Sequence, residues 1–170
     1  LGHADTRLLL RVDDLINAED LVDSATTAFE LGWRIIKLYF MIGLPTETEV
    51  DLDALVELAA RVKKAGKGTQ GGADVNVSVS TFVPKAHTPF QWEAQIGYEE
   101  TIARQEMLRG ALKKKRLRLK WHDAELSFLE GVFARGDRRL GAVLEEAVKQ
   151  GCRFDGWREH FRYDIWMEAF

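Results

Sequence analysis

Hydrophobic and polar positions in the first half of the chain follow two periods, which predict alternating helices and strands. Between residues 18 and 31, apolar residues recur every three or four positions, as in an amphipathic helix, and Asn17 is placed to cap it. Residues 35–42 are almost all β-branched, aromatic or aliphatic, and the run stops at Gly43. Such a run predicts a buried strand directly after the helix.

The next two elements repeat this alternation. Apolar residues at helical spacing from 52 to 62 predict a second helix, and Thr48 with Asp51 has the spacing of its N-terminal cap. After a glycine-rich linker, residues 75–80 alternate between valine and a polar residue, which predicts a strand with one apolar face. A strand, helix and strand in this order normally form a parallel sheet, so we expect the valines to face helices.

The polar faces of the two strands predict a second feature. If the sheet curves into a barrel, the side chains opposite the valines point inward, although two strands alone cannot enclose a cavity. The side chains that would line such a cavity are Lys37, Tyr39, Met41, Asn76, Ser78 and Ser80.

The second half of the chain has helical spacing for most of its length. We expect helices at about residues 97–116, 124–134 and 139–149, and a short strand through Leu117, Leu119 and Trp121. Residues 154–170 are rich in aromatic side chains, which are expected to pack across these helices or against other parts of the protein.

Composition narrows the class of protein. The 170 residues are 46% hydrophobic and 30% charged, which excludes a disordered chain, and the net charge of -3 argues against binding nucleic acid or anionic lipid through bulk charge. No apolar run approaches the roughly 20 residues of a membrane helix, and a signal-peptide pattern is absent, so we expect a cytoplasmic protein. The single cysteine, Cys152, excludes an internal disulfide or a cluster held by several thiolates of this chain. Because the chain begins at Leu1 without a methionine, we expect it to be a piece of a longer polypeptide.

Two loops lie where ligands bind in parallel α/β sheets, at the carboxyl ends of the strands. In the turn 43–48, Gly43 lets a ligand approach the backbone, the amides at the helix start can donate hydrogen bonds, and Glu47 can accept them. In the loop 82–90, two prolines and an aromatic residue at each end can wall a planar ligand. The alternatives are purely structural: a turn followed by a helix cap in the first loop, and a rigid loop packed into the core in the second.

Longer stretches of the chain resemble one family. The segment IKLYFMIGLPTETEVDLDALVELA and the later segment VNVSVSTFVPKAHTPFQWEAQ resemble the last strands of a radical S-adenosylmethionine (SAM) barrel, in particular that of the B12-binding-domain-associated radical SAM proteins. The downstream LKWHDAELSFLEGVFARGDRRLG and RFDGWREHFRYDIWMEAF resemble the C-terminal extension of the same group. The resemblance implies an α/β fold in which residues 1–95 are the C-terminal portion of a partial (β/α) barrel with parallel strands, and residues 96–170 are a mainly helical extension.

The resemblance also implies positions that bind the adenine of SAM. A Gly-x-Ile-x-Gly-like motif ends the relevant strand in the family; Met41 and Gly43 take its Ile and second Gly places, and Tyr39 replaces the first Gly. Glu47 matches the acid of the family's GLPxET variant, and the next strand is expected to contribute mainly backbone contacts. The implied cofactor-binding residues are Met41, Gly43, Pro45, Glu47, Phe82 and Pro84.

The family's iron-sulfur chemistry is not contained in this chain. In the family, a Cys-x-x-x-Cys-x-x-Cys motif holds the [4Fe-4S] cluster that cleaves SAM reductively, and its absence here implies that it lies upstream in the same polypeptide. The resemblance thus implies an enzyme only for the complete protein, with SAM and the cluster as cofactors and cobalamin as an option. It indicates neither the substrate nor catalytic residues in this chain.

Two features bear on the SAM carboxylate. Relatives carry an asparagine followed by a basic residue that contacts the SAM carboxylate, and Asp13 and Asp14 stand at these positions here. An aspartate would repel the SAM carboxylate, so either the alignment shifts or SAM binding is impaired. Lys37, if it points into a barrel, needs a partner, which would be the substrate, the SAM carboxylate or Glu47. Alternatively, Lys37 extends from the sheet edge into solvent.

A different class of function is also open. The basic segment 113–120 falls at a helix C-terminus, where the helix dipole favours cations. Together with the aromatic C-terminus, it is alternatively a surface that contacts RNA or a protein partner in a non-catalytic binding module. A third hypothesis is another α/β-barrel enzyme that uses the Gly43 turn as an anion site.

Overall fold

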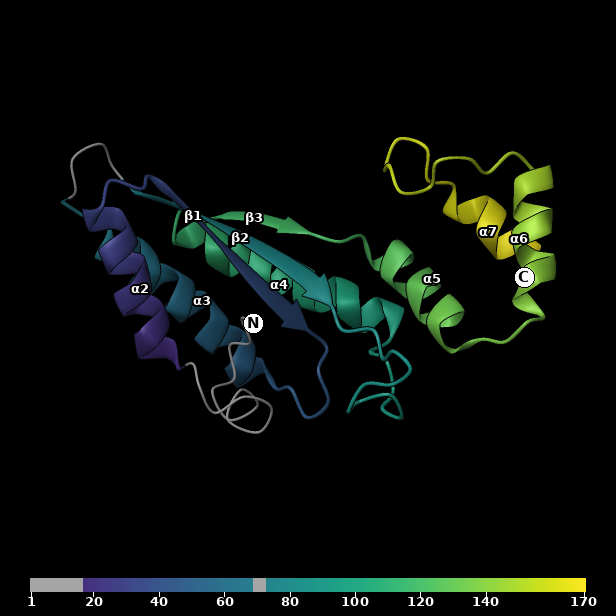
Figure 1. Cartoon of the computed structure of the whole chain (residues 1–170), viewed down its shortest axis with the longest axis horizontal. Helices are drawn as coiled ribbons and strands as arrows, with labels where there is room; N and C mark the ends of the chain where they lie inside the picture. Colours follow the sequence, from purple (N-terminus) through teal and green to yellow (C-terminus); the bar gives the residue numbers. More distant parts are fainter. Residues whose placement is uncertain (1–16, 69–72) are drawn as a thin grey trace. The chain divides into compact units, whose positions relative to one another are not determined.

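The computed structural model describes residues 17–68 and 73–170 (Figure 1). Contacts within the chain divide it into two compact units. The first unit extends to Phe82 and resumes from Gln95 to His122, and the second combines Val83–Ala94 with Asp123–Phe170. Each unit has its own hydrophobic core.

The first unit is a parallel sheet with helices packed on one face. Its three strands have the order β1-β2-β3, and both neighbouring pairs are parallel. Helices connect the strands, so α3 leads from β1 to β2 and α4 leads from β2 to β3. In chain order the elements are α2 (Ala18–Glu30), β1 (Ile35–Ile42), α3 (Glu49–Ala65), β2 (Asp74–Thr81), α4 (Tyr98–Lys114) and β3 (Arg118–Trp121).

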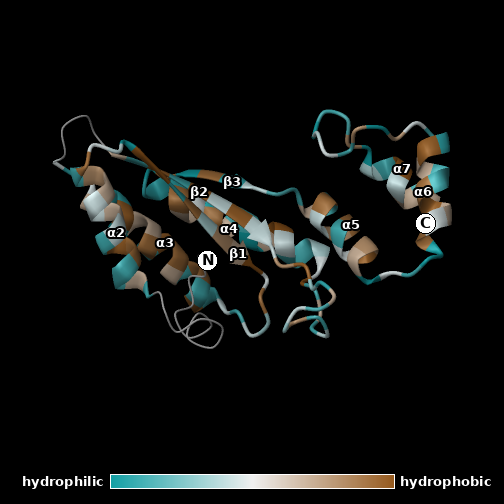
Figure 2. Ribbon diagram, in the orientation of Figure 1, coloured by the Kyte–Doolittle hydropathy of each residue, from teal (hydrophilic) through white to brown (hydrophobic). Residues whose placement is uncertain are grey.

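Alternation along the strands decides which face the helices cover. Val75, Val77 and Val79 of β2 are buried, and the residues between them are only half-buried. These valines share one core cluster with Phe40 of β1, Leu108 of α4 and side chains of α2 and α3, and Figure 2 shows hydrophobic residues along these elements. Burial of each such side chain stabilises the fold by roughly 1.5 to 3 kcal/mol. The predicted contact between the valines and helices is confirmed.

Capping residues start two helices where the sequence pattern predicts them. The Asn17 side chain accepts the backbone N–H of Asp20 at 3.0 Å, and the Asp20 carboxylate accepts the backbone N–H of Asn17 at 2.9 Å, which is a capping box for α2. At α3, the Asp51 carboxylate accepts both the backbone N–H and the hydroxyl of Thr48, each at 2.8 Å. Because Thr48 caps α3, the helix begins immediately after the turn that ends β1.

The third strand lies in the first unit, next to β2. The sequence pattern predicts a short strand near residues 117–121 within an extension that begins at residue 96, whereas β3 pairs in parallel with β2. Both α4 and β3 therefore belong to the first unit. Leu119 and Trp121 pack against the helix-covered core, and Arg118 and Lys120 alternate with them on the opposite face.

The second unit is helical in its regular structure. Its helices are α5 (Ala124–Arg135), α6 (Leu140–Lys149) and α7 (Tyr163–Ala169). Trp166 of α7 is buried in a small core, edge-on to Phe133 of α5 with the ring centroids 5.5 Å apart. The expected packing of the aromatic C-terminus is thus confirmed for Trp166, whereas Phe154 and Trp157 are exposed.

The class of fold agrees with the sequence pattern at a coarse level: a mixed α/β chain whose parallel sheet is followed by helices. A closed barrel needs more than the three strands described here, so the partial barrel stays a prediction. Within the part of the chain that the structure describes, no helix combines the length and the apolar character needed to cross a membrane.

Candidate functional site

The turn between β1 and α3 brings a glycine, a proline and a buried carboxylate together at the carboxyl edge of the sheet. Gly43 and Thr46 have left-handed backbone, with φ of 79° and 67°. The backbone N–H of Glu47 closes the turn by donating to the carbonyl three residues earlier at 3.0 Å. Phe82, the residue after β2, donates its N–H to the Ile42 carbonyl at 2.7 Å. The ends of β1 and β2 are thus hydrogen-bonded at the edge of the sheet where this turn begins.

The Glu47 carboxylate links the turn to a distant helix. Its side chain is only 6% exposed, and its Oε1 atom accepts the backbone N–H of Gly43 at 2.9 Å. The same oxygen is paired with the guanidinium of Arg104 in α4, which also pairs with Glu100. The carboxylate therefore bridges the start of the turn and α4 through charge-assisted hydrogen bonds.

These contacts change two expectations about the turn. The sequence suggests Glu47 as one of three partners for Lys37, whereas the cation that is paired with Glu47 in the structure is Arg104. An anion site at the Gly43 amide requires a free N–H, whereas this N–H donates to Glu47. The polar groups of the turn are hydrogen-bonded within the protein, as the structural alternative for this loop predicts.

Arg104 has no local sequence signal for its role. It lies 57 residues beyond Glu47, in a helix where other arginine and glutamate residues form exposed neighbouring pairs such as Arg109 with Glu106. Burial distinguishes the two arginines, because the side chain of Arg104 is 19% exposed and that of Arg109 is 60% exposed. Only the packing of α4 against the turn identifies the ion pair.

Burial sets the protonation behaviour of Glu47. Removal from water raises the pKa of its carboxyl above the usual range, and this effect outweighs the Gly43 N–H and the Arg104 guanidinium, which act in the opposite direction. The carboxyl therefore keeps its proton to a higher pH in the folded protein than in the unfolded chain.

Gly43 is required by the space around it as well as by its backbone angle. A Cβ at this position would lie 2.5 Å from Cγ2 of Ile96 and 3.1 Å from its Cβ. The φ of 79° is one that residues with a side chain rarely adopt. The protein's own Ile96 thus fills the space that the missing side chain leaves.

The remaining residues with a predicted cofactor contact divide between the two units. Met41 at the end of β1 and Pro45 in the turn are half-buried, and Phe82 is buried. Pro84 is also buried but belongs to the second unit. The predicted cofactor residues that belong to the first unit therefore lie at one edge of the sheet.

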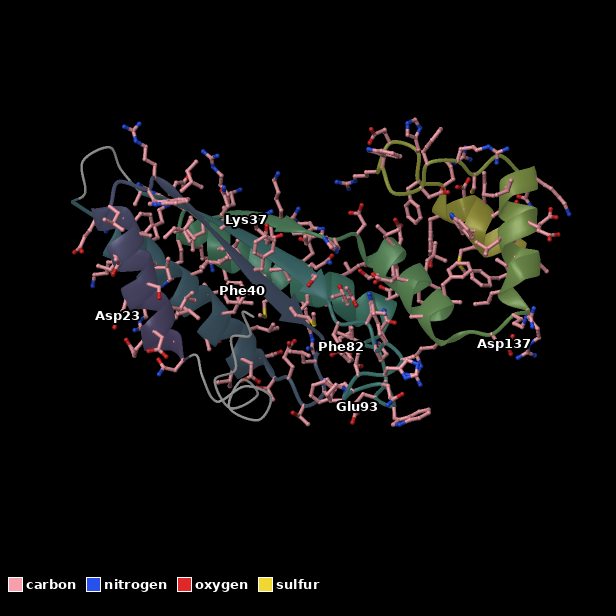
Figure 3. The ribbon with its side chains drawn as sticks, in the orientation of Figure 1. Asp23, Lys37, Phe40, Phe82, Glu93 and Asp137 are labelled. Carbon is pink, nitrogen blue, oxygen red and sulfur yellow. The ribbon has the colours of Figure 1, made fainter. Side chains whose placement is uncertain are left out.

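The residues predicted to line a cavity share the face of the sheet that the helices do not cover. Figure 3 shows Lys37 and Phe40 on opposite sides of β1. The Nζ atom of Lys37 lies 4.5 Å from the centre of the Tyr39 ring, and both side chains are exposed. The register places Lys37 beside Asn76, Tyr39 beside Ser78 and Met41 beside Ser80. The common face agrees with the sequence pattern, and the enclosed cavity stays a prediction.

The basic segment 113–120 is divided between two elements. Lys115 follows the end of α4 and pairs with Glu57 of α3, in a position where the helix dipole favours a cation. The two later cations of the segment lie on β3. Contact with RNA or a protein partner stays a prediction. Asp13 and Asp14, which bear on the SAM carboxylate, lie outside the described residues.

Metal-ligating side chains do not cluster in residues 17–68 and 73–170, where no group of three or more His, Cys, Asp or Glu could hold an ion. Cys152 is buried in the second unit. Burial raises the pKa of its thiol, and the nearby Asp155 acts in the same direction. Cys152 is therefore held as an unreactive thiol.

Comparison with known proteins identifies a relative but no family. No family model matches the chain, and no solved structure matches it. An uncharacterized protein of Methanocaldococcus jannaschii is 33% identical to this chain over 137 residues. The match covers 80% of this chain and 28% of that relative, so the chain spans less than a third of the length of the protein it matches.

Proposed function

We propose that this chain forms the SAM adenine-binding edge of a radical SAM barrel, together with a helical extension on the substrate side. The complete protein would cleave SAM reductively with a [4Fe-4S] cluster whose cysteines lie elsewhere in the polypeptide, with cobalamin as an option. The observation that carries the proposal is the sheet of the first unit, in which three sequential parallel strands have the described helices packed on one face and mainly polar side chains on the other.

Sequential winding is the arrangement from which barrels are built. In doubly wound sheets the strand order reverses and helices cover both faces, whereas in (β/α) barrels each strand is added beside the previous one and the helices stay outside. The β1-β2-β3 order is sequential, as in a barrel and as within one half of a doubly wound sheet, so the second face of the sheet decides between them. The uncovered face is mainly polar, and a second helix layer would require apolar residues there. A partial barrel accounts for both properties of the sheet.

The carboxyl edge of the sheet fits an adenine ring. Met41 is half-buried on the uncovered face and offers an apolar, polarisable side chain against which a planar ring can lie. Phe82 is buried and its N–H donates to the Ile42 carbonyl, so its part in the proposal is to fix the end of β2 beside Met41. Glu47 is used within the protein and is a positioning residue that holds the turn.

The cluster does not fit the residues of this chain. A [4Fe-4S] cluster of this family needs three thiolates, and the chain has one cysteine, which is buried. The proposal therefore places the cluster in another part of a longer protein. The relative from M. jannaschii supports such a longer protein, because 28% of its length matches this chain.

The complete coding sequence and its product test the cluster. We expect a Cys-x-x-x-Cys-x-x-Cys motif upstream of Leu1, and about four iron and four sulfide per chain after anaerobic reconstitution of the complete protein. Replacement of the three motif cysteines with alanine should remove the iron, and the control Cys152→Ala should keep it. A complete protein that lacks the motif, or iron that depends on Cys152, would overturn the proposal.

A further inference from the structure

Positive charge collects on the uncovered face of the sheet although the whole chain is acidic. The register aligns two rows of side chains across the three strands. One row has two cations and a neutral polar side chain, and the other has one cation and two neutral polar side chains. The first row is Lys37, Asn76 and Arg118, and the second row is Tyr39, Ser78 and Lys120. These six residues are called the cationic face. They carry three positive charges in a chain with a net charge of -3, and one carboxylate, that of Asp74 two positions before Asn76 on β2, lies beside them.

One of the three cations of this face has an internal carboxylate partner. Arg118 lies 3.5 Å from Asp74 at the start of β2, and this carboxylate is shared with Lys63 at 3.8 Å. Among the described residues, Lys37 and Lys120 form no ion pair with a carboxylate, and the Nζ atom of Lys37 lies over the Tyr39 ring. Charges that a fold leaves unpaired on one surface are available to an anionic ligand.

The dimensions of the cationic face suit a small anion. Neighbouring strands are about 4.8 Å apart, so the outer strands β1 and β3 are about 10 Å apart. The two rows are separated by two residues along each strand, which is about 6.6 Å. The long side chains of lysine and arginine can converge over an area of this size, which matches one phosphate or diphosphate group rather than an extended nucleic-acid strand.

We propose that the cationic face binds a small molecule through a phosphate or diphosphate group. A phosphate carries up to two charges and several acceptor oxygens, which can use the three cations together with the Asn76 amide and the Ser78 hydroxyl. A carboxylate has two acceptor oxygens and would leave most of these donors unused. The inference is separate from the SAM proposal, because it uses the middle of the three strands, whereas the SAM proposal uses the strand end at Met41 and the turn that follows it.

Titration of the protein with inorganic pyrophosphate tests this site. In isothermal titration calorimetry at low salt, we expect saturable binding that weakens as sodium chloride is added. The double variant Lys37→Gln/Lys120→Gln should bind at least about tenfold more weakly, because two charge-assisted contacts are lost. The matched control Lys113→Gln/Lys114→Gln removes the same charge from exposed positions at the end of α4 and should stay within about twofold of the wild type.

Three results would overturn the proposal. Wild-type protein could fail to bind pyrophosphate, or the control could lose as much affinity as the double variant. A single-stranded 12-nucleotide RNA could bind more tightly than pyrophosphate and depend on Lys113 and Lys114, which would assign the charge to RNA. If circular dichroism shows that the double variant is unfolded, the single variant Arg118→Gln on the same face replaces it, with an expected loss of about fivefold.

Discussion

The substitution Gly43→Ala should destabilise the first unit by about 2 to 5 kcal/mol. An alanine held at the φ of Gly43 costs about 1 to 2 kcal/mol. Its methyl group would also lie 2.5 Å from Cγ2 of Ile96, and such overpacking costs about 1 to 3 kcal/mol. The two costs add because one concerns the backbone angle and the other concerns the space beside it. Urea denaturation followed by circular dichroism measures the change in the free energy of unfolding.

Two further variants separate these costs. Gly32 has φ of 92°, and no atom lies within 4 Å of the place that a Cβ would take, so Gly32→Ala should carry only the cost of the backbone angle. In an Ile96→Ala background the Cγ2 contact is gone, so the additional loss caused by Gly43→Ala should be smaller than in the wild type. Equal losses for Gly32→Ala and Gly43→Ala would show that Ile96 does not pack against the turn as described.

The substitution Arg104→Gln should cost about 3 kcal/mol at pH 8, because it leaves the buried Glu47 carboxylate without its cation. The loss should be smaller at pH 5. Burial already raises the pKa of Glu47, and removal of Arg104 takes away one of the groups that oppose this rise. The protonated carboxyl needs no cation, so acid relieves the loss. Free energies of unfolding at the two pH values measure the difference.

The sign of the pH effect follows from proton linkage. A carboxyl whose pKa is higher in the folded state binds its proton more tightly when folded, so its contribution to stability is greatest at low pH. That contribution declines as the pH rises from the unfolded value of the carboxyl through its folded value. Glu47→Gln cannot titrate and should remove this decline. The exposed pair of Arg109 and Glu106 provides the control, because Arg109→Gln should change stability by less than about 0.5 kcal/mol at either pH. A loss for Arg104→Gln that is equal at pH 5 and pH 8 would contradict the buried pair.

Local patterns in the sequence were sufficient for the first four elements. The helix α2, the strand β1, the helix α3 and the strand β2 lie within a few residues of their predicted bounds. Their signals are short in range: apolar periodicity, a cap three residues from its partner, and glycine or proline at an end. The parallel pairing of β1 and β2 follows because a helix connects them.

The packing of α4 and β3 on the sheet could not be predicted from such local patterns. The buried side of α4 includes Thr101 and Gln105, and the Gln105 side chain donates to the His122 carbonyl at 2.9 Å. Polar residues at buried positions weaken the apolar period, so the sequence does not show that α4 covers the sheet. β3 is only four residues long, and two of its four side chains are cations that alternate with apolar ones. Its neighbours are set by tertiary packing.

The candidate site was predictable in its location but not in its bonding. Consecutive residues from Met41 to Glu47 must lie at the end of β1, because the strand and the next helix bracket them. The role of Glu47 depends on Arg104, which is 57 residues away. Likewise, Arg118 and Lys120 join Lys37 on one face only because β3 pairs with β2 in this register. Contacts of this kind come from the three-dimensional arrangement alone.

Reductive cleavage of SAM by the complete protein is the measurement that tests the proposed function most directly. Iron-loaded, anaerobic protein is reduced with dithionite in the presence of SAM, and 5′-deoxyadenosine is quantified by chromatography. We expect the wild type to form 5′-deoxyadenosine and Met41→Asp to form at least about tenfold less with unchanged iron, because a charge would replace the apolar contact to adenine. The control Val50→Asp, at an exposed position of α3, should match the wild type. No 5′-deoxyadenosine from the iron-loaded wild type, or an undiminished yield from Met41→Asp, would contradict the assignment of this sheet edge to SAM.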